Sequence, residues 1–420
     1  MGGRPPAPRG DPLSDQPQNH PGTPEGCERI AYAVGFMENA SYSDVYGGGG
    51  ALVGLDCHLL RPVDQPPDTL IVFMHPVGGG MYLPMVRGLA RAGHHVLWAN
   101  SRYRGADYAL IMEKVACDLG QAIHDARNRL GYSKIVLAGW SGGGSLSMWY
   151  QALAEAGVGI SETAAGDSYE VAAEKMPPAD AVMMLAAHVS RHQIFTEWID
   201  PSIHDESQPD VRDAALNLYD PLNPNQPPYT AEFVETFREA QVNRNRRITA
   251  WVKEKLAEIR ASDTPHREFA FTVHGTMADP RWLDPMVEPS DRAPGTCYLG
   301  DPVVVNDGPV GLARFCTLRS WLSQWSIDDA RCDAVASGPG VSVPLLVVGN
   351  TADDACTPSH TQRLFDAVPH DRKQMYEVQG ATHYYTGPDG KAHMKEAIGV
   401  ISAFIATHLG TKTDATGDQS

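Results

Sequence analysis

The stretch Ala138–Ser147, AGWSGGGSLS, decides how the rest of the chain is interpreted. It ends a continuous apolar run, Lys134–Gly139, and precedes a segment with the composition of a helix. A short apolar run bounded by glycine is typical of a strand buried on both faces. Ser141 has one glycine two residues before it and another two residues after it, so strand and helix can approach closely without a Cβ between them. The stretch therefore predicts a sharp strand–turn–helix junction with a serine at its apex.

Strand and helix patterns alternate on both sides of this junction. Apolar runs typical of buried strands lie at 69–76, 94–100 and 179–187, and helical patterns lie at 81–93 and 107–131. The alternation resumes with a strand pattern at 342–350 and ends with a helical one at 395–410. Strands that alternate with helices across short loops predict a mostly parallel, doubly wound sheet covered on both faces.

The alternation stops between about 189 and 340, where the sequence is mostly helical or irregular. We therefore predict one α/β domain in two parts, 28–188 and 341–410, with residues 189–340 inserted after the sixth strand. Residues 1–27 are rich in proline, glycine and polar residues that cannot bury a core, so we expect a disordered tail there, and a loose tail at 411–420.

Composition excludes several classes of function. The formal net charge of −17 disfavours nucleic acid and anionic membranes as partners, because both need clustered basic residues. No stretch has the roughly 20 apolar residues of a membrane span, and the N-terminus lacks the apolar region of a secretory signal. The seven cysteines are dispersed, which favours reduced thiols. We therefore expect a cytoplasmic protein, with homo-oligomerisation left open.

A nucleophilic serine needs a base, and the base needs an acid to orient it. The strand pattern at 342–350 is followed by two carboxylates, Asp353 and Asp354. The next strand pattern is followed by His383. The carboxyl ends of parallel strands meet at one edge of a sheet, so these side chains are expected to lie near Ser141.

These motifs resemble the α/β-hydrolase superfamily over Ala51–Ala187 and Ser342–Leu409. Gly139–Gly143 matches its G-x-S-x-G elbow, and His383 lies in a similar G-x-x-H turn. The segment Gly349 to Pro358 is similar to the family's G-x-x-D-x-x-x-P, with two extra residues before the acid. Counting back from the proline favours Asp354 as the triad acid, and Asp353 is the alternative. The resemblance also implies that 189–340 is a cap over the active site.

The resemblance further implies an oxyanion hole of two backbone N–H groups. Gly142, which follows the nucleophile, supplies one. The loop His75–Gly80 resembles the family's donor loop, but Pro76 has no N–H, so Val77 is the expected second donor and Gly78 the alternative. Trp140, Gly78 and His188 are candidate substrate contacts.

We expect neither cofactor nor metal. The first strand is not followed by the G-x-G-x-x-G of a dinucleotide site, and His188 and His192 have no evident third ligand. The prediction is a serine hydrolase with an acyl-enzyme that cleaves an ester or lactone of a bulky apolar small molecule. The alternatives are a C–C bond hydrolase, an acyltransferase, a peptidase, and a catalytically inactive binding protein.

Overall fold

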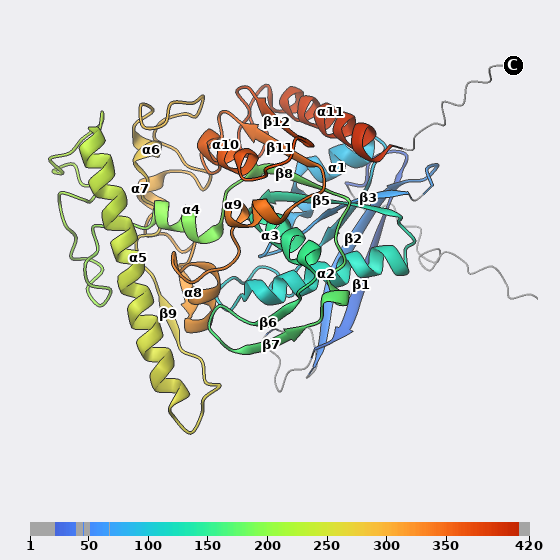
Figure 1. The fold of residues 1–420 in the computed structure, drawn as a ribbon. Coiled ribbons are helices and arrows are strands. Elements are labelled where there is room, and N and C mark those ends of the chain that lie inside the picture. Colours follow the sequence, from blue (N-terminus) through green and yellow to red (C-terminus); the bar gives the residue numbers. More distant parts are fainter. Residues whose placement is uncertain (1–21, 39–44, 46–50, 67, 411–420) are drawn as a thin grey trace, which may run out of the picture.

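A computed structural model describes residues 22–38, 45, 51–66 and 68–410 (Figure 1). Its main sheet has eight strands: β1 (Cys27–Met37), β2 (Leu52–Pro62), β3 (Thr69–Phe73), β4 (His95–Ala99), β5 (Lys134–Ser141), β8 (Ala181–Ala187), β11 (Leu345–Asn350) and β12 (Lys373–Val378). Their spatial order is β1-β2-β4-β3-β5-β8-β11-β12. β2 runs antiparallel to both β1 and β4, and all the other neighbours are parallel. The predicted sheet is confirmed.

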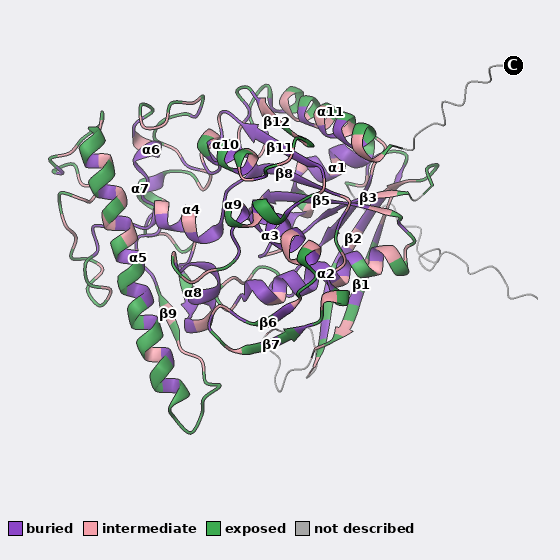
Figure 2. Cartoon of the chain, viewed as in Figure 1, coloured by how far each residue is buried: buried purple, intermediate pink, exposed green. Residues whose placement is uncertain are grey.

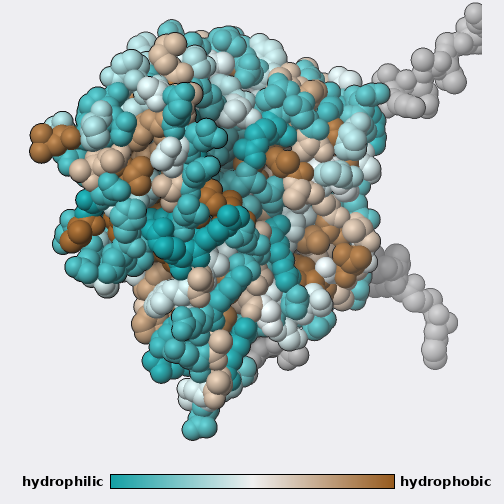
Figure 3. Space-filling model, turned by 60° about the vertical axis from the view of Figure 1, so that its left-hand side comes forward, coloured by the Kyte–Doolittle hydropathy of each residue, from teal (hydrophilic) through white to brown (hydrophobic). Residues whose placement is uncertain are grey.

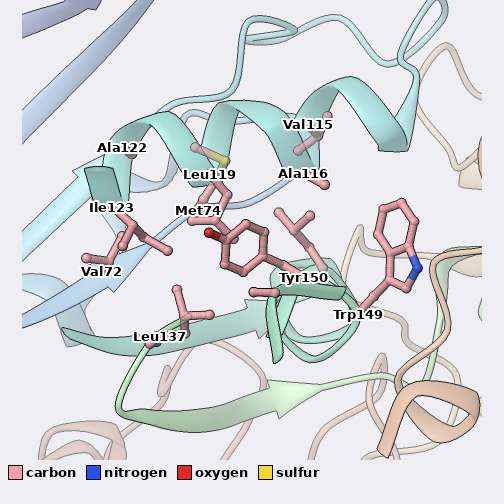
Figure 4. Close-up of a cluster of buried hydrophobic side chains, with 14 of the residues drawn as sticks. Val72, Met74, Val115, Ala116, Leu119, Ala122, Ile123, Leu137, Trp149 and Tyr150 are labelled. Atoms are coloured by element: carbon pink, nitrogen blue, oxygen red, sulfur yellow. The ribbon is translucent and has the colours of Figure 1, made fainter. Parts of the chain in front are cut away.

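Helices cover both faces of this sheet, as its apolar strands require. They are α1 (Pro84–Arg91), α2 (Met112–Asn128), α3 (Gly142–Ala156), α10 (Pro358–Asp366) and α11 (Gly390–Leu409). One buried cluster joins the sheet to α2 and α3, where Leu119, Ile123 and Tyr150 pack against Val72 and Leu137 (Figure 4). A second cluster joins the opposite face to α1 and α11. The core therefore lies on both sides of β5, the strand that carries Ser141.

Several short elements connect these parts. They are the 3₁₀ turns η1 (Gly80–Tyr82) and η2 (Ala173–Lys175) and the small antiparallel pair β6 (Ile160–Glu162) and β7 (Ser168–Val171). The sequence patterns did not indicate the β6–β7 pair.

The segment 189–340 is inserted after β8, the sixth strand of the main sheet along the chain. It contains α4 (Arg191–Trp198), α5 (Ala231–Arg260), β9 (Ala270–Thr272), α6 (Pro280–Leu283), α7 (Pro302–Val305), β10 (Phe315–Thr317), α8 (Leu318–Gln324), α9 (Ala334–Ser337) and η3 (Gly338–Gly340). Its own core gathers Phe195, Ile248, Trp321 and Trp325. α5 buries a single stripe and exposes the rest (Figure 2). On the face shown in Figure 3, hydrophilic side chains dominate and hydrophobic ones are interspersed among them.

Some boundaries differ from the predictions. The helix expected at 107–131 begins at Met112, so Asp107 lies in the preceding loop. The tail expected at 1–27 ends earlier, because Cys27 begins β1. Residues 1–21 and 411–420 lie outside the described residues.

All seven cysteines are described, and each is buried and free, in line with the expected reduced thiols. Within the described ranges, no helix is both long enough and apolar enough to cross a bilayer.

Candidate active site

Ser141 occupies a strained turn at the junction of β5 and α3. Its φ of 51° and ψ of −120° lie outside the regions that side chains ordinarily favour. A Cβ on Gly139 would lie 2.4 Å from the Cα of Gly144, and one on Gly143 would lie 2.5 Å from the carbonyl oxygen of Met74. Both neighbours are backbone atoms that cannot move aside cheaply. The predicted close packing of strand and helix is therefore confirmed.

His383 and Asp353 form a buried pair close to this turn. The Nδ1 of His383 lies 2.7 Å from Oδ2 of Asp353. The other carboxylate oxygen, Oδ1, accepts the backbone N–H groups of Ala355 and Cys356 at 2.8 and 2.7 Å. Three donors thus hold the carboxylate in one orientation. Because Nδ1 donates to it, Nε2 of the neutral ring is left with a free lone pair.

The expectation that Asp354 contacts the histidine is wrong. The carboxylate that is hydrogen-bonded to His383 is that of Asp353. The carbonyl oxygen of Asp354, the next residue in the turn after β11, accepts the indole N–H of Trp282 at 2.7 Å. Burial, and next the charge of Asp353, raise the pKa of Asp354 to about 6. The motif spacing failed here because two extra residues after Gly349 change which carboxylate the turn directs inward.

The surroundings of His383 combine burial with a fixed negative charge. Burial disfavours the protonated ring, but the charge and hydrogen bond of Asp353 outweigh it, so the pKa of His383 is raised above its ordinary value. The ring packs edge-on against Trp140 and Tyr384, with centroids 5.8 and 4.7 Å away. The pair is thereby shielded from bulk water.

The topology brings these residues to one edge of the sheet. Ser141 ends β5, Asp353 follows β11, His383 follows β12, and the parallel strands β5, β8, β11 and β12 are successive neighbours. A serine on a strained strand-to-helix turn, followed along the chain by an acid and a histidine, is the arrangement of the nucleophile elbow. The chain has the α/β-hydrolase fold. This assignment follows from its own strand order and elbow.

Comparisons with known proteins find only distant structural likeness. No family model matches the chain, and no curated protein matches it. Among solved structures, it is similar to the α/β hydrolase GrgF from Penicillium sp. sh18, with 12% identity, 90% of this chain and 99% of that chain covered, and a TM-score of 0.47. The siderophore hydrolase EstB from Aspergillus fumigatus is 11% identical over 89% and 97% of the two chains, with a TM-score of 0.46. Similarity this distant carries no information on activity.

The expected second oxyanion donor also needs correction. The Val77 N–H points to Nδ1 of His75 at 3.3 Å, and the Gly78 N–H donates to the carbonyl oxygen of His75 at 2.8 Å. The Gly79 N–H donates to Oδ1 of Asn100 at 2.7 Å. Pro76 has no N–H group. The N–H groups of Val77 and Gly78 are hydrogen-bonded to His75 in the same loop. Neither Val77 nor Gly78 has its N–H free for a substrate.

The ring of His75 carries an N–H group of its own. Because its Nδ1 accepts the Val77 N–H, the proton of the neutral ring is on Nε2. Burial, then the charges of Arg191 and His383, lower the pKa of His75 to about 3, so the ring is neutral at ordinary pH. A Cβ on Gly142 would lie 3.0 Å from this Nε2. The N–H of His75 thus lies beside Gly142, the other expected donor.

Ser141 and His383 line a cavity of about 260 Å³ between the sheet edge and the inserted segment. The candidate contacts Trp140, Gly78 and His188 also line it, as does Val77. From the inserted segment come Arg191, Trp198, Tyr298 and Leu312. Ser141, His383, Val77 and the three candidate contacts are therefore brought together at one cavity, whereas Gly142 and Asp354 are not among the residues that line it.

Several groups near Ser141 were not predicted: the His75 side chain, Asp107 and Arg191, which line the cavity, and Cys356. His75, Asp107 and Arg191 follow β3, β4 and β8, so the rule that sites lie beyond the carboxyl ends of parallel strands points to them. Cys356 follows β11, and its thiol interacts with the Ser141 hydroxyl. Burial, with Asp353 next, raises the pKa of this thiol well above its ordinary value, so it is protonated at neutral pH.

One set of side chains is close enough to hold a metal ion. Donor atoms of Asp353, Cys356 and His383 lie within 4.8 Å of one another. Asp353 and His383 are hydrogen-bonded to each other, however, and the thiol is protonated, so the set suits proton transfer better than metal binding. The pair considered in the sequence is separated, because His188 lines the cavity while His192 lies 3.3 Å from Asp333.

Proposed function

We propose that the protein is a serine hydrolase that cleaves a carboxylic ester or lactone through Ser141, His383 and Asp353. The observation that carries this proposal is the buried His383–Asp353 pair, with Nε2 of the ring free, in the cavity that Ser141 lines. A histidine held in this tautomer by a carboxylate is suited to remove a proton from a serine hydroxyl.

The reaction proceeds in two halves. Nε2 of His383 takes the proton of Ser141 as Oγ forms a bond to the carbonyl carbon, and Asp353 stabilises the charged ring. The N–H of Gly142 and the Nε2–H of His75 stabilise the oxyanion. The C–O bond to the leaving alcohol then breaks, and His383 gives the alcohol its proton. A water molecule, deprotonated by His383, releases the acid from the acyl-enzyme and restores Ser141.

The cavity favours a compact substrate. Its volume of about 260 Å³ is below the usual range for pockets that hold drug-sized ligands. Its lining includes Arg191, Asp107 and two histidines as well as aromatic rings. These features favour a small ester with polar groups over the bulky apolar substrate that the sequence led us to expect.

Labelling with a fluorophosphonate probe tests the nucleophile. We expect one adduct, located on Ser141 by mass spectrometry, and none on Ser141→Ala. Ser145→Ala is the matched control, because it removes a hydroxyl from the same helix and should still be labelled. A folded protein that takes up no label would refute the proposal.

A substrate panel then tests the reaction. The proposal expects turnover of p-nitrophenyl esters or lactones that is lost in Ser141→Ala. Turnover of aminoacyl anilides alone would favour a peptidase, and cleavage of a C–C bond alone would favour a C–C bond hydrolase. Acyl transfer to an added alcohol without net hydrolysis would favour an acyltransferase.

A further inference from the structure

Arg191 is a buried cation at the active-site cavity with few partners. It begins α4, directly after the loop that follows β8, and its side chain is 5% exposed. Among the residues that the structure describes, its side chain has a single hydrogen-bond acceptor, Asp107, with Nη2 3.5 Å from Oδ2. A strong charge-assisted bond is nearer 2.8 Å. The Nε atom is buried and has no partner.

Two other buried arginines in this chain have many more partners. Arg244 donates to both oxygens of Glu206 and to three backbone carbonyls, at distances of 2.6 to 3.1 Å. Arg102 is held by Asp118 and Glu38 at 2.7 to 3.2 Å. A guanidinium has five donors, and leaving them unpaired in a buried site costs free energy. Arg191 thus has fewer hydrogen-bond partners than either of these arginines, and its guanidinium lines the cavity.

The guanidinium is nevertheless held in a fixed place. Its Cζ lies 4.3 Å from the centroid of the Trp325 ring, so it stacks on an aromatic face that itself belongs to the core of the inserted segment. Nη1 points to the oxyanion region, because a Cβ on Gly142 would lie 3.5 Å from it. The same point lies 3.4 Å from Nε2 of His188. Nitrogen atoms thus converge beside Gly142, and one of them carries a permanent positive charge.

The pKa shifts of Arg191 and Asp107 indicate that the positive charge of Arg191 is only partly balanced by Asp107. Burial lowers the pKa of Arg191, and Asp107 opposes this effect only in part. Burial also raises the pKa of Asp107, although Arg191 lowers it. Arg102, which has two close carboxylates, behaves in the opposite way: burial opposes its charge, but Asp118 raises its pKa well above the ordinary value. An anion bound near Arg191 would supply the close negative charge that Asp107, at 3.5 Å, does not provide.

We propose that Arg191 binds a free carboxylate of the substrate, so that the enzyme acts on esters that carry a carboxylate a few bonds from the scissile carbonyl. This inference rests on the proposed function and narrows its substrate class. The planar guanidinium matches a carboxylate with two parallel hydrogen bonds. A phosphate dianion would fit less well, because its larger charge would meet the carboxylate of Asp107 in the same cavity.

Matched ester pairs test this inference. The first pair, mono(4-nitrophenyl) glutarate and 4-nitrophenyl pentanoate, tests a carboxylate on the acid side of the ester. The second pair, the butyrate esters of 4-hydroxybenzoate and of phenol, tests a carboxylate on the alcohol side. We expect kcat/KM to favour the acidic member of at least one pair about 10-fold or more. This preference should fall at least about 10-fold in Arg191→Gln. It should persist in Arg246→Gln, an exposed arginine on α5 paired with Asp328. No preference in either pair, or one that survives in Arg191→Gln, would overturn the inference.

A binding measurement separates the two proposals. Ser141→Ala cannot form an acyl-enzyme, but it retains Arg191, so glutarate binding to this variant is followed by tryptophan fluorescence and calorimetry. We expect saturable binding that weakens about 10-fold or more when Arg191→Gln is added, with correct folding checked by circular dichroism. Equal binding with and without Arg191 would overturn the carboxylate site even if the enzyme hydrolyses esters. Arg191-dependent binding in a protein whose serine takes no probe would support the carboxylate site and refute the hydrolase.

Discussion

The Nδ1 of His383 lies 2.7 Å from Oδ2 of Asp353, and both side chains are buried at the end of the sheet. The carboxylate is anchored from behind by two backbone N–H groups, so it cannot rotate away from the ring. The pair therefore fixes the tautomer of His383, and with it the atom that can act as a base. Four predictions follow from this pair and its surroundings.

The first prediction concerns the acid. Asp353→Asn should lower kcat about 10³- to 10⁴-fold, because an amide that donates to Nδ1 would favour the wrong tautomer of His383. Steady-state kinetics with a p-nitrophenyl ester measure the loss. Asp354→Asn is the matched control, one residue away, and should retain most of the activity. Equal losses in the two variants would contradict the assignment of Asp353.

The second prediction concerns pH. Only the neutral form of His383 accepts a proton from Ser141, and its pKa is raised above the ordinary value. The kcat/KM should therefore fall as the pH decreases, with an apparent pKa above about 6.5. Profiles of kcat/KM between about pH 5 and pH 9 measure this limb. In Asp353→Asn the limb should move to lower pH, and a limb that stayed in place would argue against the pair as its origin.

The third prediction concerns the oxyanion. His75→Ala should lower kcat about 10²- to 10³-fold with a smaller effect on KM, because the Nε2–H contact strengthens as negative charge develops. His75→Gln, which retains an N–H donor, should recover part of the loss. His204→Ala, on an exposed histidine of the inserted segment, serves as the control. A loss confined to KM would instead indicate a role in substrate binding.

The fourth prediction concerns stability. The pKa of Asp354 is about 6 in the fold, raised by burial and then by Asp353, from an ordinary value of 3.8. The folded protein therefore binds more protons than the unfolded chain between these values, so the free energy of unfolding falls as pH rises through this window. Asp354→Asn should remove this loss and be more stable than the parent protein by about 1 kcal/mol at pH 8, with no gain near pH 4.

Urea denaturation at the two pH values measures the difference. Asp68→Asn is a useful comparison, because hydrogen bonds from Ser133 and Lys134 lower the pKa of that carboxyl. Its stabilising effect is present above the unfolded pKa and is lost at lower pH, so the comparison variant should be less stable than the parent at pH 8. A pH-independent effect of Asp354→Asn would contradict the prediction.

The sequence by itself determined the sheet and the strand–turn–helix junction with Ser141 at its apex. Buried parallel strands have continuous apolar runs, and glycines on both sides of a serine at the end of such a run permit the sharp turn and the close approach of the helix. His383 was also predictable. It follows β12, the second strand of the main sheet after β8, so it lies at the same edge of the sheet. These features depend on local composition and on spacing along the chain.

Only the tertiary structure decided which carboxylate meets His383 and which N–H groups of the His75–Gly80 loop are already hydrogen-bonded. Asp353 and Asp354 are adjacent and chemically alike, so the choice depends on how the lengthened turn after β11 is oriented by its hydrogen bonds. The N–H groups of Val77 and Gly78 are hydrogen-bonded to His75 within their own loop, and no pattern in the sequence reveals this. Arg191 and Asp107 come from loops 84 residues apart in the chain, and their long, incomplete pairing exists only because the inserted segment folds over the sheet edge.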